Sequence, residues 1–299
     1  MSMLLITGSY RIIGDRPDGD TVHFTPRDPG FWCEVPGQHR VKRDENGGAS
    51  LRLDGIDATE THYKGVGPDF VHQPLRLGAH AARDELLSWL GFDDVEQDTE
   101  EKVEASTPET VPGYILTSGA DVYGRCVALI GRGDPPETGN PPKPAKSGER
   151  VDVTVDMLHR TANHHLLSRG LVYPTFYSGL PRELRANMTT TTQEARAAQV
   201  PGGVWSYDVT TSGAKIDSLA SLTDELVIVP KLFRRLADHI RLFGPSLACL
   251  PAYLAGGADE FYVPGQRDSI VGLQHVVEVT NGNTFRMTRP IEDLVFVEK

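Results

Sequence analysis

The sequence predicts an α+β fold, and three observations support that expectation. Two stretches, residues 76–90 and 226–243, place apolar side chains at three- and four-residue spacing, which is typical of amphipathic helices. The 299 residues are 39% hydrophobic and 24% charged, as in ordinary globular chains with one large or two modest domains. Five runs have strand-like composition and period, at residues 4–13, 21–26, 50–56, 113–119 and 125–131.

One short segment combines a guanidinium with two carboxylates. Arg52 lies in a strand that is expected to end at Asp57, and Glu60 follows three residues later. Carboxylates so placed repel one another unless a hard cation or a phosphate-bearing ligand lies between them. The alternative is a solvated acidic turn, with Thr59 or Thr61 as the N-cap of a helix.

Two tight turns each present a charged residue at the start of a strand. The sequence Asp-Gly-Asp-Thr-Val at residues 18–22 places Asp20 just after an Asp-Gly turn. Residues 121–125, Asp-Val-Tyr-Gly-Arg, lead into another strand, which begins at Arg125. Taken alone, each turn is a common feature of β-hairpins.

Taken together and in this order, the three segments resemble the site of the staphylococcal-nuclease-like (thermonuclease, SNase-like) family. That site is built from a D-G-D-T-V turn, an R-x4-D-x2-E segment and a Y-G-R segment. Residues 157–170 and 183–198 match the later helices of the family, and residues 203–208 match its closing tail. The resemblance covers about residues 3–208. It implies an OB-like five-stranded β-barrel with three helices, in a nuclease domain at residues 1–210.

The resemblance also implies a metal site. Asp20, Asp57 and the backbone carbonyl of Ala58 would hold Ca²⁺, a hard ion that prefers oxygen ligands. Mg²⁺ or Mn²⁺ are the alternatives. Glu60 would orient or deprotonate the attacking water.

The remaining implied roles concern the substrate, which is DNA or RNA with a preference for single strands, cut at the 5′ oxygen. Arg52 and Arg125 would contact phosphate oxygens and stabilise the transition state. Tyr123 would help to position the neighbouring phosphate. Phe176 and Tyr177 lie where the family stacks a base, although core packing explains these two aromatic residues equally well.

The chain departs from the family pattern at several places. Three insertions, residues 27–49, 92–112 and 132–150, fall in expected loops. The third is rich in proline and glycine and predicts an extended, mobile connector. Val122 replaces a phosphate-contacting Lys of the family. Residues 93–109 contain eight acids and one Lys, account for most of the formal net charge of −11, and predict a solvated or disordered loop.

The C-terminal region shows no recognisable catalytic pattern. A linker at residues 210–214 and the helical stretch are followed by strand-like runs at residues 269–280 and 284–297, which an Asn-Gly turn separates. We expect a small α+β appendage at residues 215–299. It would dock on the nuclease domain, bind a protein partner or mediate self-association.

Other features of the sequence indicate where the protein is located in the cell. No apolar run approaches membrane-spanning length, and the N-terminal residues do not form a signal peptide, so we expect a cytoplasmic protein with no membrane partner. The three cysteines lie far apart and predict reduced thiols.

The alternative function is a catalytically silent OB-like module that binds nucleic acid or protein. Surface or packing roles are expected for His159, Asn163, His164 and His165, and exposed helix positions for Arg234, Arg235 and Arg241.

Overall fold

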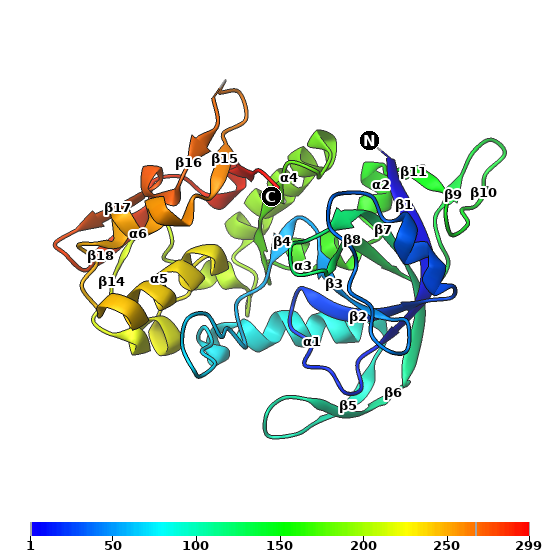
Figure 1. Cartoon of the computed structure of the whole chain (residues 1–299), viewed down its shortest axis with the longest axis horizontal. Helices are drawn as coiled ribbons and strands as arrows, with labels where there is room; N and C mark the ends of the chain where they lie inside the picture. Colours follow the sequence, from blue (N-terminus) through cyan, green and yellow to red (C-terminus); the bar gives the residue numbers. More distant parts are fainter. Residues whose placement is uncertain (1, 267, 299) are drawn as a thin grey trace. The chain divides into compact units, whose positions relative to one another are not determined.

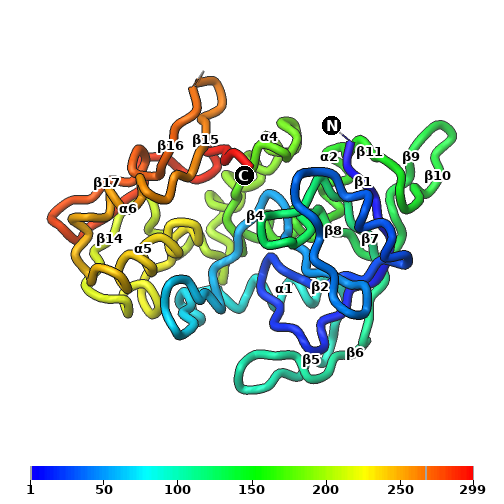
Figure 2. The backbone as a smooth tube through the Cα atoms, viewed as in Figure 1, coloured from blue at the N-terminus to red at the C-terminus, as the bar shows by residue number. Residues whose placement is uncertain are grey.

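The computed structural model describes residues 2–266 and 268–298. Its contacts divide the chain into two compact units. The first consists of residues up to Asp54, Arg83–Leu166 and Gly179–Met188, and the second consists of Gly55–Ala82, Leu167–Ser178 and the chain from Thr189 onward. Each unit therefore combines segments that are distant in the sequence, whereas the sequence predicts a division at residues 210–215 (Figure 2).

The first unit contains a closed, mixed β-barrel of five strands, which is OB-like (Figure 1). The strands follow one another around the barrel in the order β1, β2, β3, β8 and β7, and β7 pairs with β1 to close it. All neighbours are antiparallel except β3 and β8. The bounds are β1 (Ser2–Arg11), β2 (Thr21–Pro26), β3 (Ala49–Leu53), β7 (Thr110–Ala120) and β8 (Cys126–Arg132).

The barrel interior explains why these runs form strands. Along β2 buried residues alternate with partly exposed ones, as expected for a strand with one face in a core. The fully buried Tyr10 hydroxyl donates to the carbonyls of Tyr114 at 2.7 Å and Gly131 at 2.9 Å, which satisfies its polar end. A Cβ at Gly131 would lie 2.1 Å from the Tyr114 ring, so this strand needs glycine where the ring crosses it. The predicted α+β class and the five strands are confirmed.

The expected helices are present with one interruption. The ranges are α1 (Ala79–Leu90), α2 (Val155–Leu158), α3 (Ala162–Ser168) and α4 (Arg182–Ala198). The single helix predicted at residues 157–170 is therefore wrong, because the chain turns between α2 and α3. Thr161 causes the break: its hydroxyl donates to the Leu158 carbonyl at 2.7 Å and accepts from the His164 N–H at 3.3 Å, which caps α3.

The acidic insert is an ordered hairpin, so the predicted loop at residues 93–109 is wrong. It consists of β5 (Asp93–Gln97) and β6 (Val103–Thr107). The buried Val103 anchors the hairpin through backbone hydrogen bonds with Gly14 at 2.8 Å and Asp15 at 2.9 Å. At the tip, the Asp98 carboxylate accepts two backbone N–H groups. Local turn chemistry and one buried apolar side chain thus order a segment whose acidic side chains remain mostly exposed, as their composition predicts.

The third insertion forms a second short hairpin, of β9 (Glu137–Thr138) and β10 (Lys143–Pro144), rather than the extended connector that was predicted. The next strand, β11 (Arg150–Asp152), adds to the edge of β1.

Short 3-10 helices are found at η1 (Pro29–Glu34), η2 (Leu75–Leu77), η3 (Val204–Ser206), η5 (Leu273–His275) and η6 (Ile291–Asp293), and a π-helical turn at η4 (Ser221–Glu225).

The second unit is built around two helices and small sheets. The helices are α5 (Pro230–Phe243) and α6 (Leu250–Gly257). One sheet orders β13 (Phe176–Tyr177), β19 (Val295–Phe296), β15 (Glu260–Tyr262) and β16 (Ile270–Val271). Another orders β14 (Ala214–Lys215), β18 (Thr284–Met287) and β17 (Val277–Thr280), and β4 (Ile56–Asp57) pairs with β12 (Tyr173–Pro174).

The expected Asn-Gly turn joins β17 and β18, with positive φ at both Asn281 and Gly282. One hydrophobic core joins this C-terminal region to segments that the sequence assigns to the nuclease domain. Phe233 of α5, for example, is fully buried in the same core as Tyr173 and Trp205. Within the described part of the chain, no helix has the length and apolar character needed to cross a bilayer.

Candidate functional site

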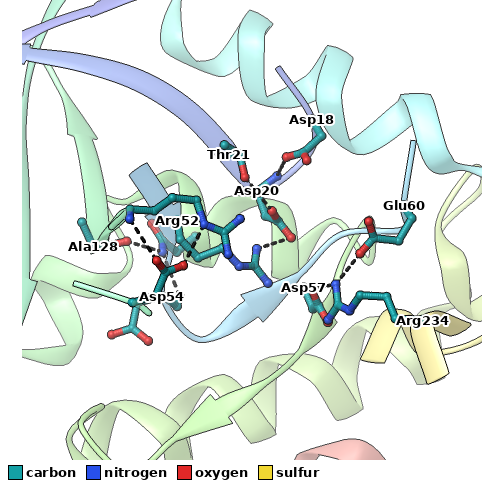
Figure 3. A network of polar contacts seen from close by, with 12 residues as sticks. Asp18, Asp20, Thr21, Arg52, Asp54, Asp57, Glu60, Ala128 and Arg234 are labelled. Atoms are coloured by element: carbon teal, nitrogen blue, oxygen red, sulfur yellow. Dashed lines mark hydrogen bonds and ion pairs between the residues drawn. The ribbon is translucent and has the colours of Figure 1, made fainter. Parts of the chain in front are cut away.

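The Asp20 turn lies in the first unit and holds Arg52. The Asp20 N–H donates to the Asp18 carboxylate at 3.1 Å, and the Thr21 hydroxyl donates to the Asp20 carboxylate at 3.2 Å. Across the sheet, the Arg52 guanidinium forms an ion pair with Asp20 (Figure 3). Both side chains are largely buried, so solvent screens this pair less than an exposed one.

Strand register explains why these residues meet. Arg52 lies opposite Thr21 of β2 on one side and opposite Val127 of β8 on the other. Val127 follows the Tyr-Gly-Arg turn by two residues. Thr21, Arg52 and Val127 therefore lie on three adjacent strands of one barrel, although they are separated by 31 or more residues in the sequence.

The turn between β7 and β8 is organised by Asp121. One carboxylate oxygen accepts the backbone N–H groups of Tyr123 and Arg125, each at 2.9 Å, and the other accepts from the Arg125 Nε at 2.7 Å. The Arg125 guanidinium also lies 5.6 Å from the centroid of the Tyr123 ring. Tyr123 is 76% exposed, which leaves its ring and hydroxyl open to a ligand.

Asp57 and Glu60 lie in the second unit and share one cation, Arg234 of α5. The Arg234 guanidinium binds both oxygens of Asp57, with Nη2 to Oδ2 at 2.8 Å and Nη1 to Oδ1 at 3.4 Å. It also forms an ion pair with Glu60 (Figure 3). Burial alone would lower the pKa of Arg234, but Asp57 and Glu60 outweigh it and raise the pKa well above the ordinary value. The guanidinium therefore stays charged.

Backbone contacts fix this carboxylate pair. Asp57 is fully buried at the end of β4, opposite Tyr173 of β12. The Glu60 N–H donates to the side chain of Gln73 at 3.1 Å, and Gln73 in turn donates to the Ile228 carbonyl at 2.8 Å. A residue of the C-terminal region thus supports the loop that carries Glu60.

Sequence reasoning missed the role of Arg234. The helical period of α5 shows that Arg234 lies on the polar face, but spacing within one helix does not reveal a partner 174 residues away. The available signal was the charge imbalance of residues 52–60, in which the carboxylates of Asp57 and Glu60 follow a single arginine. Of the other arginines on this helix, Arg235 binds Asp259 at 2.7 Å, and Arg241 donates to the backbone carbonyls of Lys64 and Asp69.

The two residues expected to stack a base differ in exposure. Phe176 is 1% exposed in β13, so its ring is a core element and offers no free face. Tyr177 is partly exposed, with its ring centroid 5.9 Å from that of Phe296 and 5.6 Å from the Lys231 ammonium. Ala58, the expected carbonyl ligand, is buried directly after Asp57.

Asn163 has a packing role. Its fully buried side chain accepts the Ile130 N–H at 3.0 Å and donates to the carbonyls of Asp54 at 2.8 Å and Ala128 at 3.0 Å. It therefore ties α3 to β8 and to the end of β3.

His164 is half-buried. Its burial, and to a lesser extent the neighbouring imidazoles of His159 and His165, lower its pKa to about 4.

The structure brings Asp20 together with Arg52 in the first unit, and Asp57 together with Glu60 in the second. Among the residues described, no group of three or more His, Cys, Asp or Glu side chains is arranged to hold a metal ion. The Asp57–Glu60 pair nevertheless suits a hard cation, because its donors are all oxygen and already converge on one positive group. No family model matches this chain, and no curated protein matches it.

Proposed function

We propose that this chain is a metal-dependent phosphodiesterase of the SNase-like type, an endonuclease that cleaves DNA or RNA and prefers single strands. The observation that carries the proposal is the register of Thr21, Arg52 and Val127 on adjacent strands of a closed barrel. This register supports the proposal because it sets Arg52 between the strand that follows the Asp20 turn and the strand that follows the Tyr-Gly-Arg turn.

Each charged residue has a role in this proposal. Arg52 and Arg125 bind phosphate oxygens through their planar guanidinium groups and stabilise the negative charge that builds in the transition state. Glu60 takes the proton of the attacking water, whose oxygen forms the new bond to phosphorus. As that bond forms, the 5′ oxygen leaves with the electron pair of the broken bond and takes a proton from solvent. Tyr123, exposed beside Arg125, positions the neighbouring phosphate.

The motif resemblance implies Asp20, Asp57 and the Ala58 carbonyl as oxygen ligands for Ca²⁺, or for Mg²⁺ or Mn²⁺. When bound, the ion neutralises phosphate charge and polarises the phosphoryl group. The side chains contribute the placement: Asp57 is held by the pairing of β4 with β12, and Asp20 by the Asp18 turn.

A second candidate is a catalytically silent OB-like module that binds nucleic acid or protein. One observation favours it: the carboxylates of Asp57 and Glu60 are both paired with Arg234, which leaves them engaged in a structural contact. Under this alternative, Arg52 and Arg125 bind phosphate without cleavage.

Cleavage of a single-stranded DNA oligonucleotide by the full chain separates the two candidates. The reactions contain Ca²⁺, Mg²⁺, Mn²⁺ or EDTA, and Arg52→Lys and Arg125→Lys are compared with the wild type. We expect metal-dependent cleavage that both substitutions impair, because Lys keeps the charge but loses the planar fork. Oligonucleotide binding without cleavage under all conditions would instead support the silent module.

A further inference from the structure

Arg234 is placed by a rigid element. Helix α5 begins at Pro230, and residues on both sides of Arg234 are fixed in the core of the second unit. Phe233 and Leu236 are fully buried there. The backbone of Arg234 is therefore held, and only its side chain is free to change partners.

The partners of Arg234 differ from those of an ordinary surface pair. Asp57 is fully buried, and a buried carboxylate without a partner is strongly destabilising. Glu60 lies close enough to share the same Nη1 atom with Asp57. Two carboxylates thus share one guanidinium, which neutralises the charge of only one of them.

The neighbouring residue gives a direct comparison. Arg235 follows on the same helix, its side chain is as exposed as that of Arg234, at 30%, and it also binds a buried carboxylate, Asp259. Lys231 lies 3.5 Å from Asp259 as well. Helix α5 thus carries two separate ion-pair groups, and only the one at Arg234 involves residues of the proposed active site.

We propose that Arg234 is the resident cation of the Asp57–Glu60 pair and that a divalent ion must displace it in order to bind. The inference rests on the proposed function, which assigns these two carboxylates to the metal site and the general base. Arg234 thereby sets the metal affinity of the protein and holds Glu60 in an ion pair when no metal is bound.

The competition follows from the shared atoms. Both oxygens of Asp57 contact the guanidinium, and a hard ion needs carboxylate oxygens from the same side chain. If the carboxylates are open in only a fraction of the molecules, the apparent dissociation constant rises by the inverse of that fraction. An occupancy of Arg234 of about 90 to 99% corresponds to roughly 10- to 100-fold weaker metal binding.

Calorimetric titration of the full chain with CaCl₂ tests this proposal. Arg234→Gln is expected to bind Ca²⁺ roughly 10- to 100-fold more tightly than the wild type. Arg235→Gln is the matched control, because it removes the same charge from the same helix without contacting Asp57 or Glu60. Its affinity is expected to stay within about twofold of the wild type, since solvent and salt screen a more distant charge.

Thermal unfolding gives a second readout that does not depend on activity. Without metal, Arg234→Gln is expected to melt below the wild type, because the buried Asp57 and its neighbour Glu60 then lose the guanidinium that they share. Ca²⁺ is expected to raise its melting temperature by more than it raises that of the wild type, because tighter binding stabilises more at equal concentration. If Arg234→Gln does not fold, Arg234→Lys is the substitute, and an affinity above that of the wild type is expected because Lys lacks the bidentate geometry.

Equal or weaker Ca²⁺ affinity in the Arg234 variant would overturn the proposal. If that variant and the wild type bind metal equally and the wild type cleaves DNA, only the role of Arg234 fails. If neither binds any divalent ion and no cleavage occurs, the proposed function fails with it. A gain in affinity that Arg235→Gln matches would also contradict the displacement of a specific guanidinium.

Discussion

Asn163→Ala is expected to destabilise the first unit because this one side chain serves three backbone groups. The Ile130 N–H loses its acceptor in a fully buried position, which costs about 1–3 kcal/mol. The Ala128 carbonyl keeps a second partner, the Asp54 N–H at 2.9 Å, so its loss is smaller. With the small cavity that the substitution leaves, the expected decrease in the free energy of unfolding is about 2–4 kcal/mol.

Hydrogen exchange measures this effect at the atom concerned. The Ile130 amide is expected to exchange roughly 30- to 700-fold faster in Asn163→Ala, since each 1.4 kcal/mol corresponds to a factor of ten. Asn187→Ala is the control, because the partly exposed Asn187 contacts an exposed side chain, that of His159, at 3.1 Å. Unchanged exchange at Ile130, or an equal effect of both substitutions, would refute the assignment of Asn163 as the link between α3 and the barrel.

Three further predictions concern protonation, the shared core and surface charge. Because the pKa of His164 falls from 6.5 to about 4 on folding, the unfolded chain binds more protons in that window. The contribution of His164 to the free energy of unfolding is therefore expected to be fully present above about pH 6.5 and to be lost as the pH falls towards 4. An NMR titration that gives the imidazole a pKa near 6.5 would contradict this. Ending the chain at residue 214 is expected to make the second unit sensitive to limited proteolysis, because Phe233 and Leu236 leave its core; a resistant remainder would instead support a domain that closes at residue 210. Replacing the exposed acids Asp93, Glu96 and Glu104 by their amides is expected to strengthen oligonucleotide binding at low salt but not at high salt, and equal effects at both would exclude electrostatic repulsion by the hairpin.

The strands of the barrel were predictable because their signal is local. In β2 (Thr21–Pro26) buried and partly exposed side chains alternate along the chain. This alternation within one short segment is sufficient to predict a strand with one buried face. The Asn-Gly turn at Asn281 and Gly282 was predictable for the same reason, since positive φ at both positions favours these residue types.

The errors arise where a single tertiary contact outweighs composition. One buried residue, Val103, orders the acidic hairpin, and one hydroxyl, that of Thr161, divides the predicted second helix. Arg234 was placed on an exposed helix face because helical period describes one element at a time. Its contacts with Asp57 and Glu60 depend on how β4 and α5 pack, and no local pattern encodes that packing.

Metal-dependent cleavage of a single-stranded DNA oligonucleotide by wild type and Glu60→Gln tests the central claim most directly. The substitution keeps the shape of the side chain but removes the base, so the rate is expected to fall roughly 10²- to 10⁴-fold while oligonucleotide binding is retained. EDTA is expected to abolish wild-type cleavage. Equal rates for the two proteins, or cleavage that persists in EDTA, would contradict the assignment of Glu60 and of the metal-dependent site.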